Sequence, residues 1–242
     1  WRAEHGDSWR LLSNPGTGTL EMLFGGNAVS PFEPNTSEPT EWFSLARYWV
    51  EQTYQMHGIE SGQLVEERFR FMPLGQVNST DKMTVRFEQV VNGVPVEDGA
   101  VNVLFDMSGR LLSVHSTAAP TLTRPSGKPT TGAGFAALVA ARAFKDEFGV
   151  QPNQMGDARL VHAHSERGEV KTWDLAWEIE ATFDSGEGQP IGRRYSIDAT
   201  GKDVRPLAVT QQMLSHEESP GWSPDGKWGA YTSTRHGNQE LY

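Results

Sequence analysis

The sequence predicts an α+β protein made of two successive modules, each with one helix packed on an antiparallel β-meander. Residues 82–116 alternate apolar and polar side chains with a period of two, and turn signals divide them into strands. Apolar residues recur at helical spacing over 37–57 and again over 134–148. The helix-then-strands order repeats after a linker at 117–131 that is rich in proline, serine and threonine.

The meander at 82–116 has one apolar face, which a helix or a second sheet must cover. Asn92-Gly93 is the dipeptide best suited to a two-residue turn with positive φ, and 106–109 supplies the second turn. These turns separate predicted strands at 84–90, 101–105 and 111–114. In the first of them, alternation places Arg86 and Glu88 on one face and Phe87 and Gln89 on the other.

The helix at 37–57 is the expected cover for this sheet. Pro39 stands in its first turn, where the missing N–H is harmless, and Gly58 ends it. Its apolar stripe is interpreted as core packing rather than as an aromatic ligand-binding face; it comprises Trp42, Leu45, Ala46, Trp49, Thr53 and Met56. Further strands are expected at 8–12, at 20–24 before Gly25-Gly26, and at 64–74.

The second module begins with Thr131 as the expected N-cap of the helix at 134–148, which Gly149 ends. Predicted strands follow at 158–163, 172–183, 193–198 and 202–207. This repeats the plan of the first module without an alignable repeat in sequence.

Composition narrows the classes of function. The formal net charge is −10, which argues against nucleic-acid binding and against docking on an anionic membrane. There is no cysteine, so disulfides and thiolate chemistry are excluded. No apolar run approaches the length needed to span a bilayer.

The meander resembles the fungalysin/thermolysin propeptide (FTP) module, the N-terminal part of the pro-region of secreted zinc metallopeptidases. The matching residues are Arg86, Phe87, Gln89, Asn92, Gly93, Val94, Pro95 and Val96, then Asp106, Gly109, Arg110 and Leu111. The family pattern has paired glycines soon after this Pro-Val. Here the chain reads Glu97-Asp98-Gly99, so an acid replaces one glycine.

Two further resemblances cover the rest of the chain. Leu175, Trp177, Glu178 and Ile179, followed by 195–204, resemble the PepSY module that follows FTP in thermolysin-like proenzymes. Residues 220–242 resemble one TolB-like β-propeller repeat, which implies a partial propeller blade. The implied domains are an FTP-like module at 1–116, a linker at 117–131, a PepSY-like module at 132–208, and a linker with the partial repeat at 209–242. Because this repeat is incomplete, we expect the natural polypeptide to continue.

The search for catalytic chemistry finds no His-Glu-x-x-His, P-loop, Rossmann or nucleophile-elbow motif. His162 and His164 share a face of a predicted strand, where solvent exposure is favoured over metal binding, and His57 and His115 are expected at the surface. Glu66-Glu67 is expected to be solvated. The candidate partner-binding residues are Arg86, Gln89, Asn92 and Val94. For Arg86, a structural salt bridge is the favoured alternative.

The predicted function is that of a non-enzymatic pro-region of a secreted or periplasmic metallopeptidase. It would act in cis, or in trans after cleavage, as an inhibitor and folding chaperone of a catalytic or effector domain of the same precursor, and it needs no cofactor. The alternative is an extracellular binding scaffold with a downstream propeller and no peptidase partner. The residues that follow 242 would separate the two.

Overall fold

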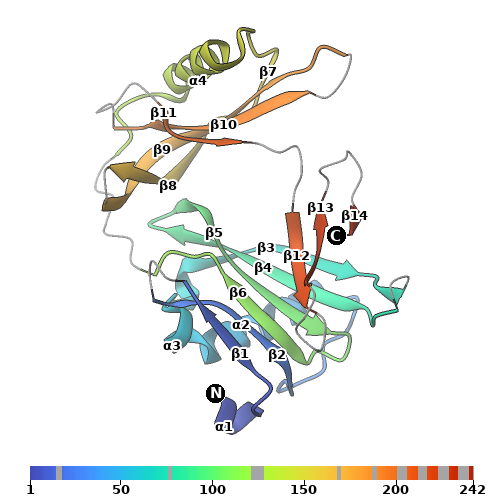
Figure 1. Ribbon diagram of the computed structural model, residues 1–242. Helices are drawn as coiled ribbons and strands as arrows, with labels where there is room; N and C mark the ends of the chain where they lie inside the picture. Colours follow the sequence, from blue (N-terminus) through green and yellow to red (C-terminus); the bar gives the residue numbers. More distant parts are fainter. Residues whose placement is uncertain are drawn as a thin grey trace.

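The computed structural model describes residues 1–14, 18–75, 78–120, 128–167, 170–186, 190–200, 206–211, 217–222, 229–233 and 240–241. The described chain is a mixed α+β structure dominated by a largely antiparallel sheet (Figure 1). Its helical elements are few: α1 (Arg2–His5), α2 (Pro39–Gln52), α3 (Tyr54–His57), the short 3₁₀ helix η1 (Ser61–Gln63) and α4 (Ala133–Phe148).

The first part of the sheet has the strand order β3-β4-β5-β6-β2-β1, and every neighbouring pair in it is antiparallel. The predicted meander forms its centre, and the two N-terminal strands extend it beyond β6. The strands are β1 (Arg10–Ser13), β2 (Leu20–Ala28), β3 (Leu64–Met72), β4 (Lys82–Val91), β5 (Val94–Asp106) and β6 (Leu111–Ser116).

Helix α2 covers one face of these strands, as its apolar stripe predicts (Figure 1). Trp42, Leu45, Ala46 and Trp49 are at most 1% exposed and belong to one core cluster with the inward residues of the meander. The indole N–H of Trp42 donates to the carbonyl of Asn35 at 3.1 Å, so this buried polar atom is satisfied. The interpretation of the tryptophan stripe as core is confirmed.

The predicted single helix over 37–57 is wrong, because the helix breaks at Thr53. The hydroxyl of Thr53 is buried and donates to the carbonyl of Trp49 at 2.8 Å, beside the backbone N–H of Thr53, which reaches the same carbonyl at 3.0 Å. Such back-bonding to the preceding turn bends helices. Helix α3 then turns the chain and ends at Gly58, which has φ of +72°.

Strand β2 does not stop at Gly25-Gly26, contrary to the sequence expectation, but runs through both glycines to Ala28. A Cβ atom on Gly26 would lie 2.0 Å from a ring atom of Trp9, which is fully buried. The glycine is therefore required by the close approach of the indole rather than by a turn.

The second part of the sheet has the order β8-β9-β10-β11, with β7 paired to the far end of β9. Helix α4 packs on it through a cluster that includes Phe144, Ile179 and Tyr195 (Figure 1). Thr131 is not the helix cap: Gly132 holds that position, and the Thr131 hydroxyl donates to the carbonyl of Asp198. The strands are β7 (Gln154–Met155), β8 (Arg159–Arg167), β9 (Val170–Phe183), β10 (Ile191–Asp198) and β11 (Pro206–Gln211).

The C-terminal strands form a separate three-stranded antiparallel sheet, and β12 lies near β5. They are β12 (Glu217–Trp222), β13 (Gly229–Ser233) and β14 (Glu240–Leu241). This small sheet does not show a propeller blade, and residues 223–228 and 234–239 of the predicted repeat fall outside the described residues. The division of the chain into these four predicted segments remains a prediction. Within the described ranges, no helix has the length and apolarity needed to cross a membrane.

Candidate functional site

The hairpin that joins β4 to β5 has the turn that its sequence predicts. Asn92 and Gly93 have φ of +54° and +77°, and the flanking Val91 and Val94 form the pair that closes the turn. Positive φ at both central residues matches the right-handed twist of the two strands. The turn therefore fixes the register of the meander.

The faces of β4 also follow the prediction. Phe87 and Gln89 are fully buried on the face that points toward the core, and Arg86 and Glu88 are only partly buried on the other. The Gln89 carbonyl oxygen accepts from Ala119 N–H at 2.8 Å, and its amide donates to the Ala119 carbonyl at 2.9 Å. Gln89 thus fastens the chain that leaves β6 to the inner side of the sheet.

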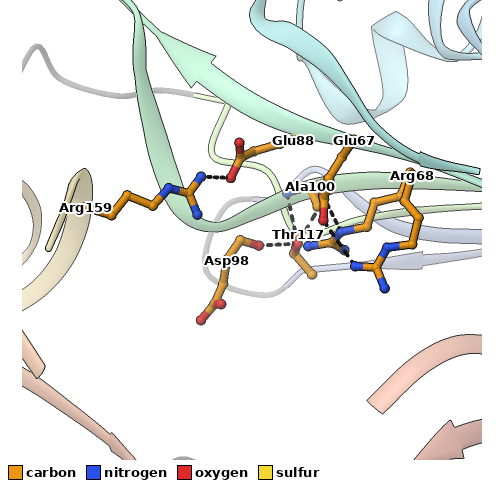
Figure 2. Close-up of polar contacts among 8 residues, drawn as sticks. Glu67, Arg68, Glu88, Asp98, Ala100, Thr117 and Arg159 are labelled. Carbon is orange, nitrogen blue, oxygen red and sulfur yellow. Dashed lines mark hydrogen bonds and ion pairs between the residues drawn. The ribbon is translucent and has the colours of Figure 1, made fainter. Parts of the chain in front are cut away.

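The Glu97-Asp98-Gly99 stretch, where the chain departs from the family pattern, is geometrically constrained. A Cβ atom on Gly99 would lie 2.8 Å from Cβ of Val96 and 3.1 Å from Oε1 of Gln89. Asp98 adopts φ of +55°, a conformation that glycine, asparagine and aspartate tolerate best. The Asp98 carbonyl accepts a hydrogen bond from the Thr117 hydroxyl at 2.5 Å, which anchors the strained residue (Figure 2).

This stretch meets the second half of the chain. Val96 forms a parallel bridge with His162, and Nε2 of His162 donates to the carbonyl of Val91 at 3.0 Å. The Ser196 hydroxyl donates to the Glu97 carboxylate at 2.8 Å. These backbone and side-chain contacts join the two halves of the sheet, and we call this region the junction.

Ion pairs add to the junction. Arg159 on β8 reaches the Glu88 carboxylate on β4 (Figure 2). Arg194 lies among three carboxylates, with nitrogen–oxygen distances of 3.6 Å to Asp98, 3.9 Å to Glu178 and 3.6 Å to Glu180. None of these side chains is fully buried, so the ion pairs add little to the stability of the fold and serve mainly to orient the two halves.

A cleft of about 490 Å³ opens beside the junction, on the sheet face opposite α2. One end carries Arg68, Arg70 and Arg86, and the Glu67 carboxylate there contacts Arg86 Nε at 2.6 Å and Arg68 Nη2 at 3.2 Å. We call this the basic end. The ion pair of Arg86 confirms the salt-bridge alternative, and Glu67 is shared between two arginines rather than simply solvated.

The opposite end is acidic: Asp98 and Glu178 lie near Arg194, and Glu97 lines the same part of the cleft. Burial raises the pKa of Glu178, while the neighbouring Arg194 partly opposes that rise. At the basic end, burial lowers the pKa of His115, Glu21 raises it, and Arg86 lowers it further. Arginines therefore gather at one end of the cleft and carboxylates at the other.

The four predicted partner-binding residues do not form one patch. Arg86 lines the cleft, Gln89 is buried with its amide satisfied, Asn92 is exposed at the turn, and Val94 is half-buried. A role for them in partner binding remains a prediction. The sequence reasoning missed Arg159 and Arg194, whose importance arises only from contacts between distant strands.

Three histidine predictions are corrected. His57 and His162 are 1% and 3% exposed rather than solvated, and His115 is partly buried. Two of them are held by backbone carbonyls: Nε2 of His57 contacts the carbonyl of Val50 at 2.9 Å, and Nε2 of His162 contacts that of Val91 at 3.0 Å. Among the residues that the structure describes, no three histidine or carboxylate side chains are grouped to hold a metal ion.

Comparison with known families assigns one part of the chain. The model of the Fungalysin/Thermolysin Propeptide Motif matches residues 80–118, which are β4, β5, β6 and their turns. Neither the PepSY nor the TolB-like resemblance is matched by a family model. No curated protein matches the chain. The meander at the centre of the first half is thus an FTP propeptide motif, which is typically non-catalytic and is associated with fungalysin- and thermolysin-like peptidases.

Proposed function

We propose that this chain is the non-catalytic pro-region of a secreted metallopeptidase, which inhibits a downstream catalytic domain and assists its folding. The match of 80–118 to the FTP motif carries the proposal, because this motif implies association with a peptidase catalytic domain. Peptidases with this motif are generally secreted, which supports an extracytoplasmic location. The PepSY resemblance at 175–204 supports the same reading, since that module follows FTP in such proenzymes.

The architecture suits a binding role. The FTP strands are anchored by a fully buried core on one face and by the junction on one edge. Such a preformed surface loses little conformational entropy when it binds. A tether to the catalytic domain would supply an effective concentration on the order of 1 mM, so a dissociation constant near 0.1 mM would hold about nine in ten domains inhibited.

This estimate sets the concentration that the assay must reach. The whole chain is titrated to roughly 0.3 mM against thermolysin and a fungalysin, since an intrinsically weak contact is sufficient in cis. The rate of cleavage of a peptide substrate and the yield of active enzyme on refolding are measured. We expect slower cleavage and a higher refolding yield with at least one enzyme. If neither quantity changes with either enzyme, the proposal is overturned and the scaffold alternative is favoured.

Variants test the predicted partner-binding residues in the same assay. Arg86→Gln and Val94→Ser should each weaken inhibition by roughly threefold or more if these side chains contact the partner, which is the scale of an exposed contact. Arg142→Gln is the matched control, because its side chain is 84% exposed on α4 and, among the described residues, it pairs within that helix with Asp146. If the wild-type chain and the three variants inhibit equally, Arg86 and Val94 do not belong to the contact surface.

A further inference from the structure

The turn between β4 and β5 contains a chemically labile dipeptide. Asn92 is followed by glycine, whereas every other asparagine of the sequence precedes a residue that has a side chain. In an asparagine–glycine pair, the backbone nitrogen of the second residue can attack the side-chain amide carbon of the first. Glycine favours this ring closure because it has no Cβ atom in the path and its backbone rotates freely.

The structure leaves this pair accessible for the reaction. Asn92 and Gly93 are both exposed, and a Cβ atom on Gly93 would meet nothing within 4 Å. In a two-residue hairpin the strand ladder resumes with the pair that closes the turn, here Val91 and Val94. The nitrogen of Gly93, which must make the attack, therefore lies in solvent and outside the ladder.

The nearby Asp98-Gly99 pair has the opposite setting. Gly99 is buried, and a Cβ atom on it would lie 2.8 Å from Cβ of Val96. The Asp98 carbonyl is held by the hydroxyl of Thr117. The backbone there has little room to rotate, so the same ring closure would require local opening of the structure.

We propose that Asn92 is a site of spontaneous deamidation, in which ring closure onto Gly93 leads to isoaspartate and loosens the junction. The nitrogen of Gly93 loses its proton and forms a bond to Cγ of Asn92, while the side-chain nitrogen leaves as ammonia. Water then opens the resulting succinimide ring at either carbonyl. One opening gives aspartate, and the other gives isoaspartate, in which the backbone runs through the former side chain.

Isoaspartate lengthens the backbone of the turn by one methylene group, and the length of the turn sets the register of the two strands. Both sides of this turn contact the same residue of the second half. Nε2 of His162 contacts the carbonyl of Val91 at 3.0 Å, and Val96 forms the parallel bridge with His162. A shift of 94–96 relative to Val91 therefore strains the junction at His162. No partner takes part, so this inference does not depend on the proposed function.

The first test follows the reaction in the whole chain, incubated in mildly alkaline buffer, where the attacking nitrogen loses its proton more readily. Peptide mass spectrometry follows each asparagine, and an isoaspartate-specific methyltransferase measures isoaspartate. We expect Asn92 to convert before any other asparagine, with isoaspartate as the larger product. If Asn92 converts no faster than the others, the proposal is overturned.

Asp98→Asn is the matched control, because it creates the same dipeptide in the buried setting. Position 98 should convert at least about tenfold more slowly than position 92, since the buried backbone must first open locally. Equal rates in the folded variant would overturn the structural argument. Circular dichroism checks that the variant is folded, and the comparison within the wild-type chain decides the proposal if it is not.

The second test measures the junction. The isoaspartate form is separated by chromatography, and hydrogen exchange is compared with that of the unmodified chain. Amides of 94–97 and 160–163 should exchange at least about fivefold faster, while those of 101–105 in the core should not change. Asn92→Asp is the control, because it adds the charge without the methylene group and aspartate tolerates positive φ. Equal exchange in Asn92→Asp and the isoaspartate form would overturn the effect on the junction.

Discussion

Gln89→Leu should destabilise the protein substantially, although Leu has a similar size and Gln89 touches no solvent. The substitution removes both hydrogen bonds to Ala119. The backbone N–H and carbonyl of Ala119 then lack these partners, although Ala119 is only 8% exposed. Each unsatisfied buried backbone group costs about 1–3 kcal/mol. Partial relaxation of the chain toward water reduces the sum, so we expect a loss of roughly 2–4 kcal/mol in the free energy of unfolding.

Urea unfolding followed by tryptophan fluorescence measures this loss, since several of the buried tryptophans are in the same core. The midpoint should fall while the slope with urea stays the same, because the surface exposed on unfolding is unchanged. Hydrogen exchange of the Ala119 amide should accelerate as well. Gln52→Leu is the matched control, because Gln52 is exposed at the end of α2, and it should change stability by less than about 0.5 kcal/mol. A loss of that small size in Gln89→Leu would refute the reasoning.

Three other perturbations test separate features. Gly26→Ala should cost about 1–3 kcal/mol or more in thermal or urea unfolding, because the new Cβ would collide with the Trp9 ring, whereas Gly62→Ala has open space and should be tolerated. Asp98→Ala should lower the free energy of unfolding by about 1–2 kcal/mol, because Asp98 has φ of +55°. Asp98→Gly should lower it by only a few tenths of a kcal/mol, since the ion pair that it loses is exposed. Equal losses in the two variants would refute the conformational argument. Burial lowers the pKa of His57 in the folded protein below the value of 6.5 expected in the unfolded chain. The contribution of buried His57 to the free energy of unfolding is therefore fully present above about pH 6.5 and is lost as the pH falls through the folded pKa. The urea midpoint should therefore be lower at pH 5.5 than at pH 7.5, with a smaller difference in His57→Gln; no difference between the two proteins would contradict this assignment.

The strands and turns of the meander were predictable because their signals are local. Alternation places Phe87 and Gln89 inside, and the Asn92-Gly93 pair has the positive φ values that the turn demands. The ends of elements were less predictable, since the helix breaks at Thr53 within a continuous helical pattern and β2 continues through two glycines. For β2 a tertiary contact, the close approach of the Trp9 indole to Gly26, decides what the local preference of glycine leaves open.

The junction and its cleft were beyond the reach of sequence patterns. Arg159 and Glu88 are 71 positions apart, and Ser196 and Glu97 are 99 positions apart. No period or short motif links such pairs, and each of these residues alone resembles an ordinary surface side chain. The buried histidines were missed for the same reason: His162 lies on a strand whose outward face becomes an interior once the second half of the sheet meets Val91.

At Glu97 and Asp98 the sequence departs from the family pattern, and both residues contact the second half of the sheet. A position with φ near +55° is filled by glycine at no steric cost, and aspartate is among the few other residues that adopt it readily. Replacing glycine there therefore costs little conformational energy and places a carboxylate where Arg194 of the second half can approach it. The neighbouring Glu97 accepts a bond from Ser196 in the same region. Because Gly99 remains, the chain can still pack closely against Val96 and Gln89. The motif thus keeps the backbone geometry it requires, while the substituted position contributes to the acidic end of the cleft.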